Sequence, residues 1–161
     1  MKYIKVGKIV NTHALKGEVR ILSSFEYKER VFKINNTLYI GQFKEPLLIE
    51  TYRKHKQFDM VKFKGIDYIN DVLKYKGDIV YFDSDLLELS DDEILEEEFT
   101  DYEVYSSDKL VGHIEEYRCD NGNKMIRLNG KFIPYNKDFI NKIDKENKKI
   151  YMHDIEVFLW K

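Results

Sequence analysis

Short apolar runs separated by polar turns fill the first half of the chain. They are rich in Ile, Val, Leu, Tyr and Phe, which favours strands. The runs cover residues 2–10, 18–22, 37–41, 46–55, 59–65 and 78–82. Because closing a sheet removes its exposed edges, five or six such strands predict a small closed β-barrel.

One helix is predicted before the last of these strands. Asp67 is suited to the N-cap, where its carboxylate would accept backbone N–H groups of the first turn. Gly77 is suited to the left-handed position that ends a helix. Four apolar residues between them are expected on one helical face: Tyr68, Ile69, Val72 and Leu73.

The second half is also rich in predicted strands. Residues 103–118 contain two strand runs around a polar turn, and Asn129-Gly130 is a strong hairpin signal because both residues tolerate positive φ. A helical turn is predicted within 136–143, and a short helix is predicted over 154–160. The remaining strand runs cover 124–128, 131–135 and 149–153. The chain is therefore predicted to be all-β with short helices, arranged as two small β-barrels.

Charge divides the chain in the same way. Residues 1–83 hold 16 Lys and Arg against 10 Asp and Glu, whereas residues 84–161 hold 11 against 19. The segment 84–98 contains eight acidic residues and no basic residue. We therefore predict a first domain over 1–84, an acidic linker over 85–97 and a second domain over 98–161. A basic half suits phosphates, and an acidic half suits a basic protein.

The sequence lacks the patterns of several enzyme and cofactor classes. It has one Cys, four scattered His, and neither the glycine pattern of a phosphate loop nor that of a dinucleotide-binding loop. No residue set suited to bond chemistry is found, so we expect neither catalysis nor a metal or other cofactor. No run is long enough to span a membrane, and no signal peptide is found, which predicts a cytoplasmic protein that we expect to be a monomer.

Basic residues gather in two places in the first half. Arg53, Lys54 and Lys56 follow the run 46–52, and Lys16 and Arg20 lie near the N-terminus. The first group is either a phosphate contact or a solvated hairpin tip. Glu18 and Arg20, two residues apart, share a sheet face, so they either pair with each other or contact a partner.

The stretch 6–21, VGKIVNTHALKGEVRI, resembles the signature of the RimM ribosome maturation factors. The resemblance continues through residues 63–83 and 132–153, and so follows the order of the family along nearly the whole chain. It implies a translation-factor-like β-barrel followed by a PRC barrel. Two departures stand out: Ala14 replaces the usual Gly after His13, and Ile94-Leu95 stand where the family often has two aromatic residues.

The resemblance also implies a function. Members are non-catalytic assembly factors that bind the immature small ribosomal subunit, assist 16S rRNA processing and folding of the head, and contact a basic head protein, number nineteen of the small-subunit series. The basic half would then approach 16S rRNA, and the acidic half the basic protein. The candidate binding residues are His13, Lys16, Gly17, Glu18, Arg20, Arg53, Lys54, Lys56, Ile94 and Leu95. The alternatives are a generic RNA-binding β-barrel, which predicts tight binding to naked rRNA, and an enzyme or cofactor-binding PRC protein, which needs a bound ligand or metal.

Overall fold

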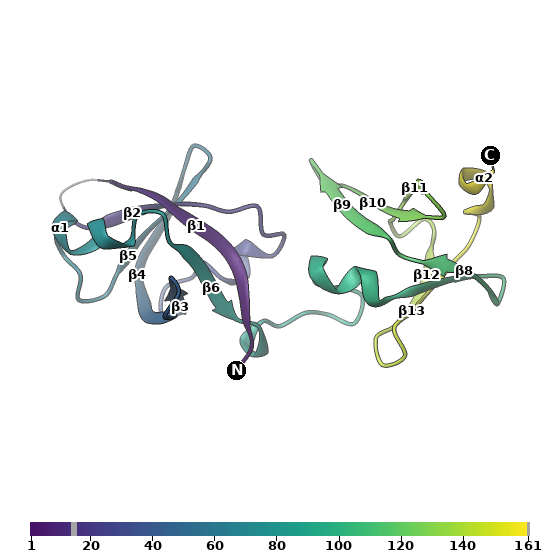
Figure 1. The fold of residues 1–161 in the computed structure, drawn as a ribbon, viewed down its shortest axis with the longest axis horizontal. Helices are drawn as coiled ribbons and strands as arrows, with labels where there is room; N and C mark the ends of the chain where they lie inside the picture. Colours follow the sequence, from purple (N-terminus) through teal and green to yellow (C-terminus); the bar gives the residue numbers. More distant parts are fainter. Residues whose placement is uncertain (14–15, 161) are drawn as a thin grey trace. The chain divides into compact units, whose positions relative to one another are not determined.

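The computed structural model describes residues 1–13 and 16–160, which form two compact units (Figure 1). The first unit is Met1–Glu88, and the second begins at Leu89. Ala14 and Leu15 lie outside the described residues. No helix in the described ranges has the length and apolar character needed to cross a bilayer.

Six strands of the first unit close into a barrel. They are β1 (Tyr3–His13), β2 (Glu18–Leu22), β3 (Thr37–Ile40), β4 (Glu45–His55), β5 (Phe58–Phe63) and β6 (Ile79–Asp83). Each pairs antiparallel with its neighbours in the order β1-β2-β5-β4-β3-β6, and β6 returns to β1. The predicted closed barrel is confirmed. The strand predicted over 2–10 extends to His13, three residues beyond its predicted end.

A bulge keeps the apolar residues of β1 on the inside of the barrel. Ile4 and Val6 are buried two residues apart, but the next buried side chain is Ile9 and Lys8 is exposed. The register with β6 shifts between Lys5 and Gly7, and this changes the alternation at that point. The bulge therefore reconciles an imperfect sequence pattern with one continuous buried face.

The predicted helix is shorter than expected and has a different cap. α1 (Ile69–Val72) continues into a 3-10 turn, η2 (Leu73–Tyr75), and Tyr68 occupies the N-cap in an extended conformation. The Asp67 carboxylate instead accepts a hydrogen bond from Lys62 Nζ at 2.8 Å, so the predicted Asp67 cap is wrong. Val72 is buried as predicted, but Tyr68 is 70% exposed.

The end of this segment follows the prediction more closely. Gly77 has a φ of +91°, so the predicted left-handed position is confirmed. Two further 3-10 turns, η1 (Lys28–Arg30) and η3 (Ser84–Leu86), complete the first unit.

The second unit is barrel-like and consists of two sheets around one core. Its elements are η4 (Glu96–Asp101), β7 (Glu103–Ser106), β8 (Lys109–His113), β9 (Glu116–Asp120), β10 (Asn123–Leu128), β11 (Lys131–Pro134), β12 (Ile140–Asp144), β13 (Lys149–Met152) and α2 (Glu156–Leu159). One sheet has the order β11-β10-β9, and the other β12-β13-β7-β8. The pairing of β13 with β7 is parallel. The all-β class with short helices is confirmed.

Local predictions in this unit had mixed outcomes. Asn129 and Gly130 both have positive φ, 51° and 80°, between β10 and β11, so the predicted hairpin is confirmed. Residues 103–118 contribute three strands, β7, β8 and β9, instead of two. The predicted helical turn is confined to Asn136–Ile140, where the Phe139 and Ile140 amides donate to the Asn136 carbonyl, and β12 starts at Ile140.

The acidic segment contributes apolar side chains to the core of the second unit. Ile94 is 3% exposed and belongs to that core, and Leu95 is 7% exposed. Nearby, the Phe99 and Tyr117 rings stack with centroids 3.9 Å apart. Ile94 is therefore a packing residue of this unit, and Leu95 is buried as well. The contact of both residues with a partner stays a prediction.

Candidate functional site

Four predicted site residues meet on the outer face of the first barrel. Register places Arg20, Met60 and Arg53 directly opposite one another on three adjacent strands, so their side chains share one face. Met60 is fully buried on this face. We call His13, Glu18, Arg20 and Arg53 the charged face.

An ion pair joins the two hairpins that form the charged face. Arg53 donates from Nε and Nη2 to the two Glu18 carboxylate oxygens, at 2.9 and 2.8 Å. This two-pronged geometry is the strongest form of an arginine–carboxylate contact. Within the described residues, Glu18 therefore pairs with Arg53 and not with Arg20. The contact of this face with a partner stays a prediction. Hydrogen bonding to Glu18 raises the pKa of Arg53 further above its already high value.

Arg20 contacts two aromatic rings of the same face. Its Nη2 lies 2.7 Å from His13 Nδ1, which must accept because a guanidinium only donates. Its guanidinium carbon lies 5.6 Å from the centroid of the Phe58 ring. The His13 and His55 rings stack at 6.1 Å. Arg20 Nε is buried and finds no acceptor among the described residues, so this face retains an unused donor.

The turn before β2 depends on Gly17. Its φ is +86°, and a Cβ there would lie 3.0 Å from the Ile66 carbonyl oxygen and 3.2 Å from that of Tyr68. Gly17 therefore allows both a left-handed turn and close approach of the segment 66–68. Tyr68 therefore lies next to the turn that contains Lys16 and Gly17. Helical periodicity predicted that Tyr68 would be buried, but it is exposed.

Two predicted lysines lie in exposed turns. Lys16 lies just before Gly17, and Lys56 follows β4 with a φ of 55°. Neither forms an ion pair with the described part of the chain. Their charges are therefore available to an anionic partner.

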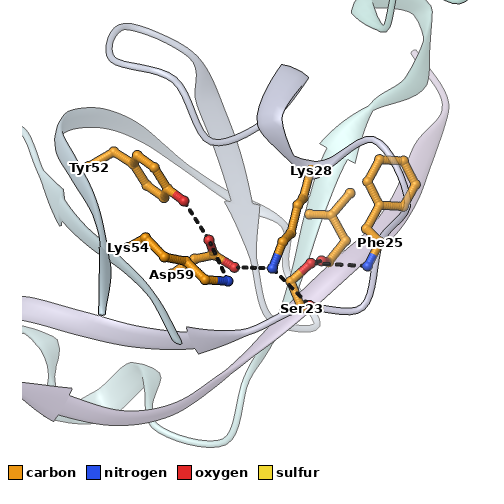
Figure 2. Close-up of polar contacts among 7 residues, drawn as sticks. Ser23, Phe25, Lys28, Tyr52, Lys54 and Asp59 are labelled. Carbon is orange, nitrogen blue, oxygen red and sulfur yellow. Dashed lines mark hydrogen bonds and ion pairs between the residues drawn. The ribbon is translucent and has the colours of Figure 1, made fainter. Parts of the chain in front are cut away.

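Lys54 follows Arg53 on β4, so its side chain lies on the opposite side of the sheet from the charged face. There it points toward a buried carboxylate (Figure 2). Asp59 is fully buried and accepts hydrogen bonds from Lys28 Nζ at 3.0 Å and from the Tyr52 hydroxyl at 2.6 Å. Lys54 Nζ lies 3.9 Å from the same carboxylate. Lys28 also donates to the Ser23 carbonyl at 3.4 Å. We call Asp59, Lys28, Tyr52 and Lys54 the Asp59 cluster.

The Asp59 cluster changes the proton affinities of its members. Burial, followed by the hydrogen bond to Asp59, raises the pKa of Tyr52. Burial alone would lower the pKa of Lys28, but that pKa is raised, and the hydrogen bond to the Asp59 carboxylate favours the charged form. The adjacent Lys28 ammonium, followed by burial, lowers the pKa of the more exposed Lys54. Lys54 therefore belongs to a structural network inside the chain and is not simply a cation on the surface.

Glu18 should make a small, pH-dependent contribution to stability. The hydrogen bonds from Arg53 lower the pKa of Glu18 from its ordinary value of 4.5, despite opposition from burial. A carboxyl with a lowered folded-state pKa stabilises the fold above its unfolded-state pKa, and this is lost as the pH falls through the folded value. We expect Glu18→Gln to cost about 0.5–1 kcal/mol at pH 7, since Arg53 is half exposed.

The measurement is urea unfolding of both proteins between pH 3 and pH 7. The difference between wild type and Glu18→Gln should be constant above about pH 5 and should shrink below pH 4.5. Glu88→Gln, an exposed carboxylate of the same unit outside the charged face, is the control. A difference that persists undiminished at pH 3 would contradict the role given to the ion pair.

Comparison with known proteins identifies the family. The profile of the RimM N-terminal domain matches residues 4–87. The ribosome maturation factor RimM of Exiguobacterium sibiricum is 38% identical over 158 residues, covering 93% of this chain and 94% of that protein. RimM of Streptococcus mutans is 38% identical over 160 residues, covering 93% of each. The solution structure of the N-terminal domain of RimM from Thermus thermophilus has a TM-score of 0.47 and 19% identity, covering 55% of this chain and 98% of that one. By its sequence, the chain therefore belongs to the RimM family of ribosome maturation factors.

Proposed function

We propose that the protein binds the immature small ribosomal subunit and assists 16S rRNA processing and assembly of the head. The observation that carries this proposal is the likeness to ribosome maturation factors over 93% of the chain. The protein would act as a non-catalytic, cytoplasmic monomer that binds rRNA and a ribosomal protein during assembly. Its function would depend on its two binding surfaces, which differ in charge.

The basic unit would contact 16S rRNA. Residues 1–88 hold 16 Lys and Arg against 12 Asp and Glu. Lys16 and Lys56 are exposed and lack ion pairs within the described ranges. Cations without internal partners gain free energy at a phosphate backbone by releasing counterions. The turns around the charged face are therefore the part of this unit that we assign to rRNA.

The acidic unit would contact the basic head protein, number nineteen of the small-subunit series. Residues 89–161 hold 17 Asp and Glu against 11 Lys and Arg. Asp91, Asp92, Glu96 and Glu97 are exposed on the segment whose Ile94 and Leu95 are buried. The apolar side chains thus fix this segment while its carboxylates face the solvent. Complementary charge of this kind mainly raises the association rate and is sensitive to salt.

A pull-down tests the proposal. Tagged wild-type protein should recover free small subunits in preference to assembled ribosomes. Recovery of naked rRNA without subunits would support the generic RNA-binding alternative, and recovery of assembled ribosomes or of no ribosomal material would contradict the proposal.

The double variant Lys16→Ala/Lys56→Ala should bind small subunits more weakly without losing stability. If both lysines contact phosphates, the slope of log K against log salt should fall by about 1.5. Binding is measured by sedimentation with purified subunits at several salt concentrations. Lys33→Ala/Lys76→Ala removes the same charge from exposed positions elsewhere in the unit. An equal loss in that control would show that only total charge matters.

A further inference from the structure

Three tyrosines share the outer face of the strands β3, β6 and β1. Tyr39 lies directly opposite Tyr81, and Tyr81 lies opposite Lys5. Tyr3 is two residues before Lys5 and so faces the same side. The Tyr3 ring lies 5.0 Å from that of Tyr39 and 6.5 Å from that of Tyr81, both edge to face. We call these three residues the tyrosine face.

Lysines surround the tyrosine face. Lys44 Nζ lies 4.2 Å from the centroid of the Tyr81 ring and 5.8 Å from that of Tyr3. Lys5 and Lys8 are exposed on β1 and form no ion pair within residues 1–13 and 16–160. The carboxylate of Asp83, opposite Tyr3, is buried and accepts the Asp85 amide. Lys5 and Lys8 therefore have no anionic partner among the residues that the structure describes.

Aromatic surface is exposed in the same region. Tyr3 is 40% exposed, and Phe43, in the β3–β4 turn next to Lys44, is 89% exposed. Single-stranded nucleic acid needs such a combination, because bases stack on aromatic rings and phosphates pair with lysines. An acidic peptide would satisfy the lysines, but its carboxylates are not planar bases that can stack on the rings.

We propose that the tyrosine face binds an unpaired RNA segment, with a base stacked on Tyr3 and phosphates held by Lys5 and Lys8. This inference rests on the proposed function for the identity of the polymer, and it adds a second RNA contact, outside the charged face. Unpaired RNA is the form that an incompletely folded rRNA exposes.

Fluorescence anisotropy of a labelled ten-nucleotide uridine oligomer measures this binding with the full chain. Tyr3→Leu should weaken binding by about 5- to 150-fold, the range for loss of one stacked base. Tyr3→Phe should bind like wild type because it keeps the ring. Lys5→Gln/Lys8→Gln should reduce the salt slope by about 1.4, whereas Tyr3→Leu should leave that slope unchanged.

Trp160→Leu is the matched control, since it removes an exposed aromatic side chain from the acidic unit. It should leave the affinity for the oligomer unchanged. Photo-crosslinking of wild-type protein to a 5-iodouridine oligomer should label the peptide that contains Tyr3, and this measurement does not depend on how any variant folds.

Three outcomes would overturn the inference: no binding of the oligomer, equal affinity of wild type and a folded Tyr3→Leu, or crosslinks confined to other peptides. The recovery of small subunits by the pull-down is measured for the same variants. If Tyr3→Leu impairs subunit recovery while the wild type binds no oligomer, the tyrosine face is a protein contact, and the proposed function stands without this inference.

Discussion

Replacing Asp59 with Ala should lower the free energy of unfolding of the first unit by about 3–5 kcal/mol, because two hydrogen bonds to a charged, buried acceptor are lost. The carboxylate is fully buried, and it is the acceptor for Lys28 Nζ and for the Tyr52 hydroxyl. Its removal leaves the partly exposed Lys28 ammonium and the Tyr52 hydroxyl without their shared acceptor. Urea unfolding followed by the amide signals of barrel residues gives the value for this unit alone.

Two variants separate charge from volume in the Asp59 cluster. Asp59→Asn keeps the size and an acceptor for Tyr52 but loses the charge, so its cost should be smaller than that of Asp59→Ala. Lys54→Ala removes a half-exposed cation 3.9 Å away and should cost less than about 1 kcal/mol. Equal, small costs for Asp59→Ala and Lys54→Ala would show that the carboxylate is not buried as described.

Gly17→Ala should destabilise the same unit by about 2–4 kcal/mol, by adding left-handed strain to overpacking. The φ of +86° disfavours any side chain, and the new Cβ would stand 3.0 Å from the Ile66 carbonyl oxygen. Because this oxygen belongs to the backbone, it cannot rotate away as a side chain could. The thermal midpoint should fall by several degrees in calorimetry.

Gly65→Ala is the matched control for Gly17. Its φ of +82° imposes the same strain, but nothing lies within 4 Å of the added Cβ. Its cost should be about 1–2 kcal/mol, which is the strain alone. If the two variants lose equal stability, close approach of the segment 66–68 contributes nothing at Gly17.

Features set by local chemistry could be predicted from the sequence. The strands followed apolar runs, and Asn129-Gly130 marked its hairpin because few residues tolerate positive φ. Where two local preferences competed, the prediction failed. Asp67 suited an N-cap, but Lys62 lies within reach across the surface and takes its carboxylate.

The charged face depends on pairing between strands that are far apart in the sequence. Arg53 and Glu18 are separated by 35 residues, and no periodicity shows that they meet. Asp59 did leave a signal, because alternation along β5 places it on the same buried side as Val61 and Phe63. An acidic residue at such a position requires a cation within reach, and Lys28 supplies it from 31 residues away in the sequence.

The strand connections set an order for folding during synthesis. The barrel needs only β6, ending at Asp83, to pair with β1, so it can close while the rest of the chain is still being translated. In the other unit, β7 pairs with β13, so residues 103–106 cannot complete their pairing until residues 149–152 have been synthesised. Until then one edge of β7 has no neighbour, and an uncovered strand edge invites association with other chains. Ribosome stalling between these two strands should therefore yield a nascent chain with a finished first unit and an aggregation-prone tail.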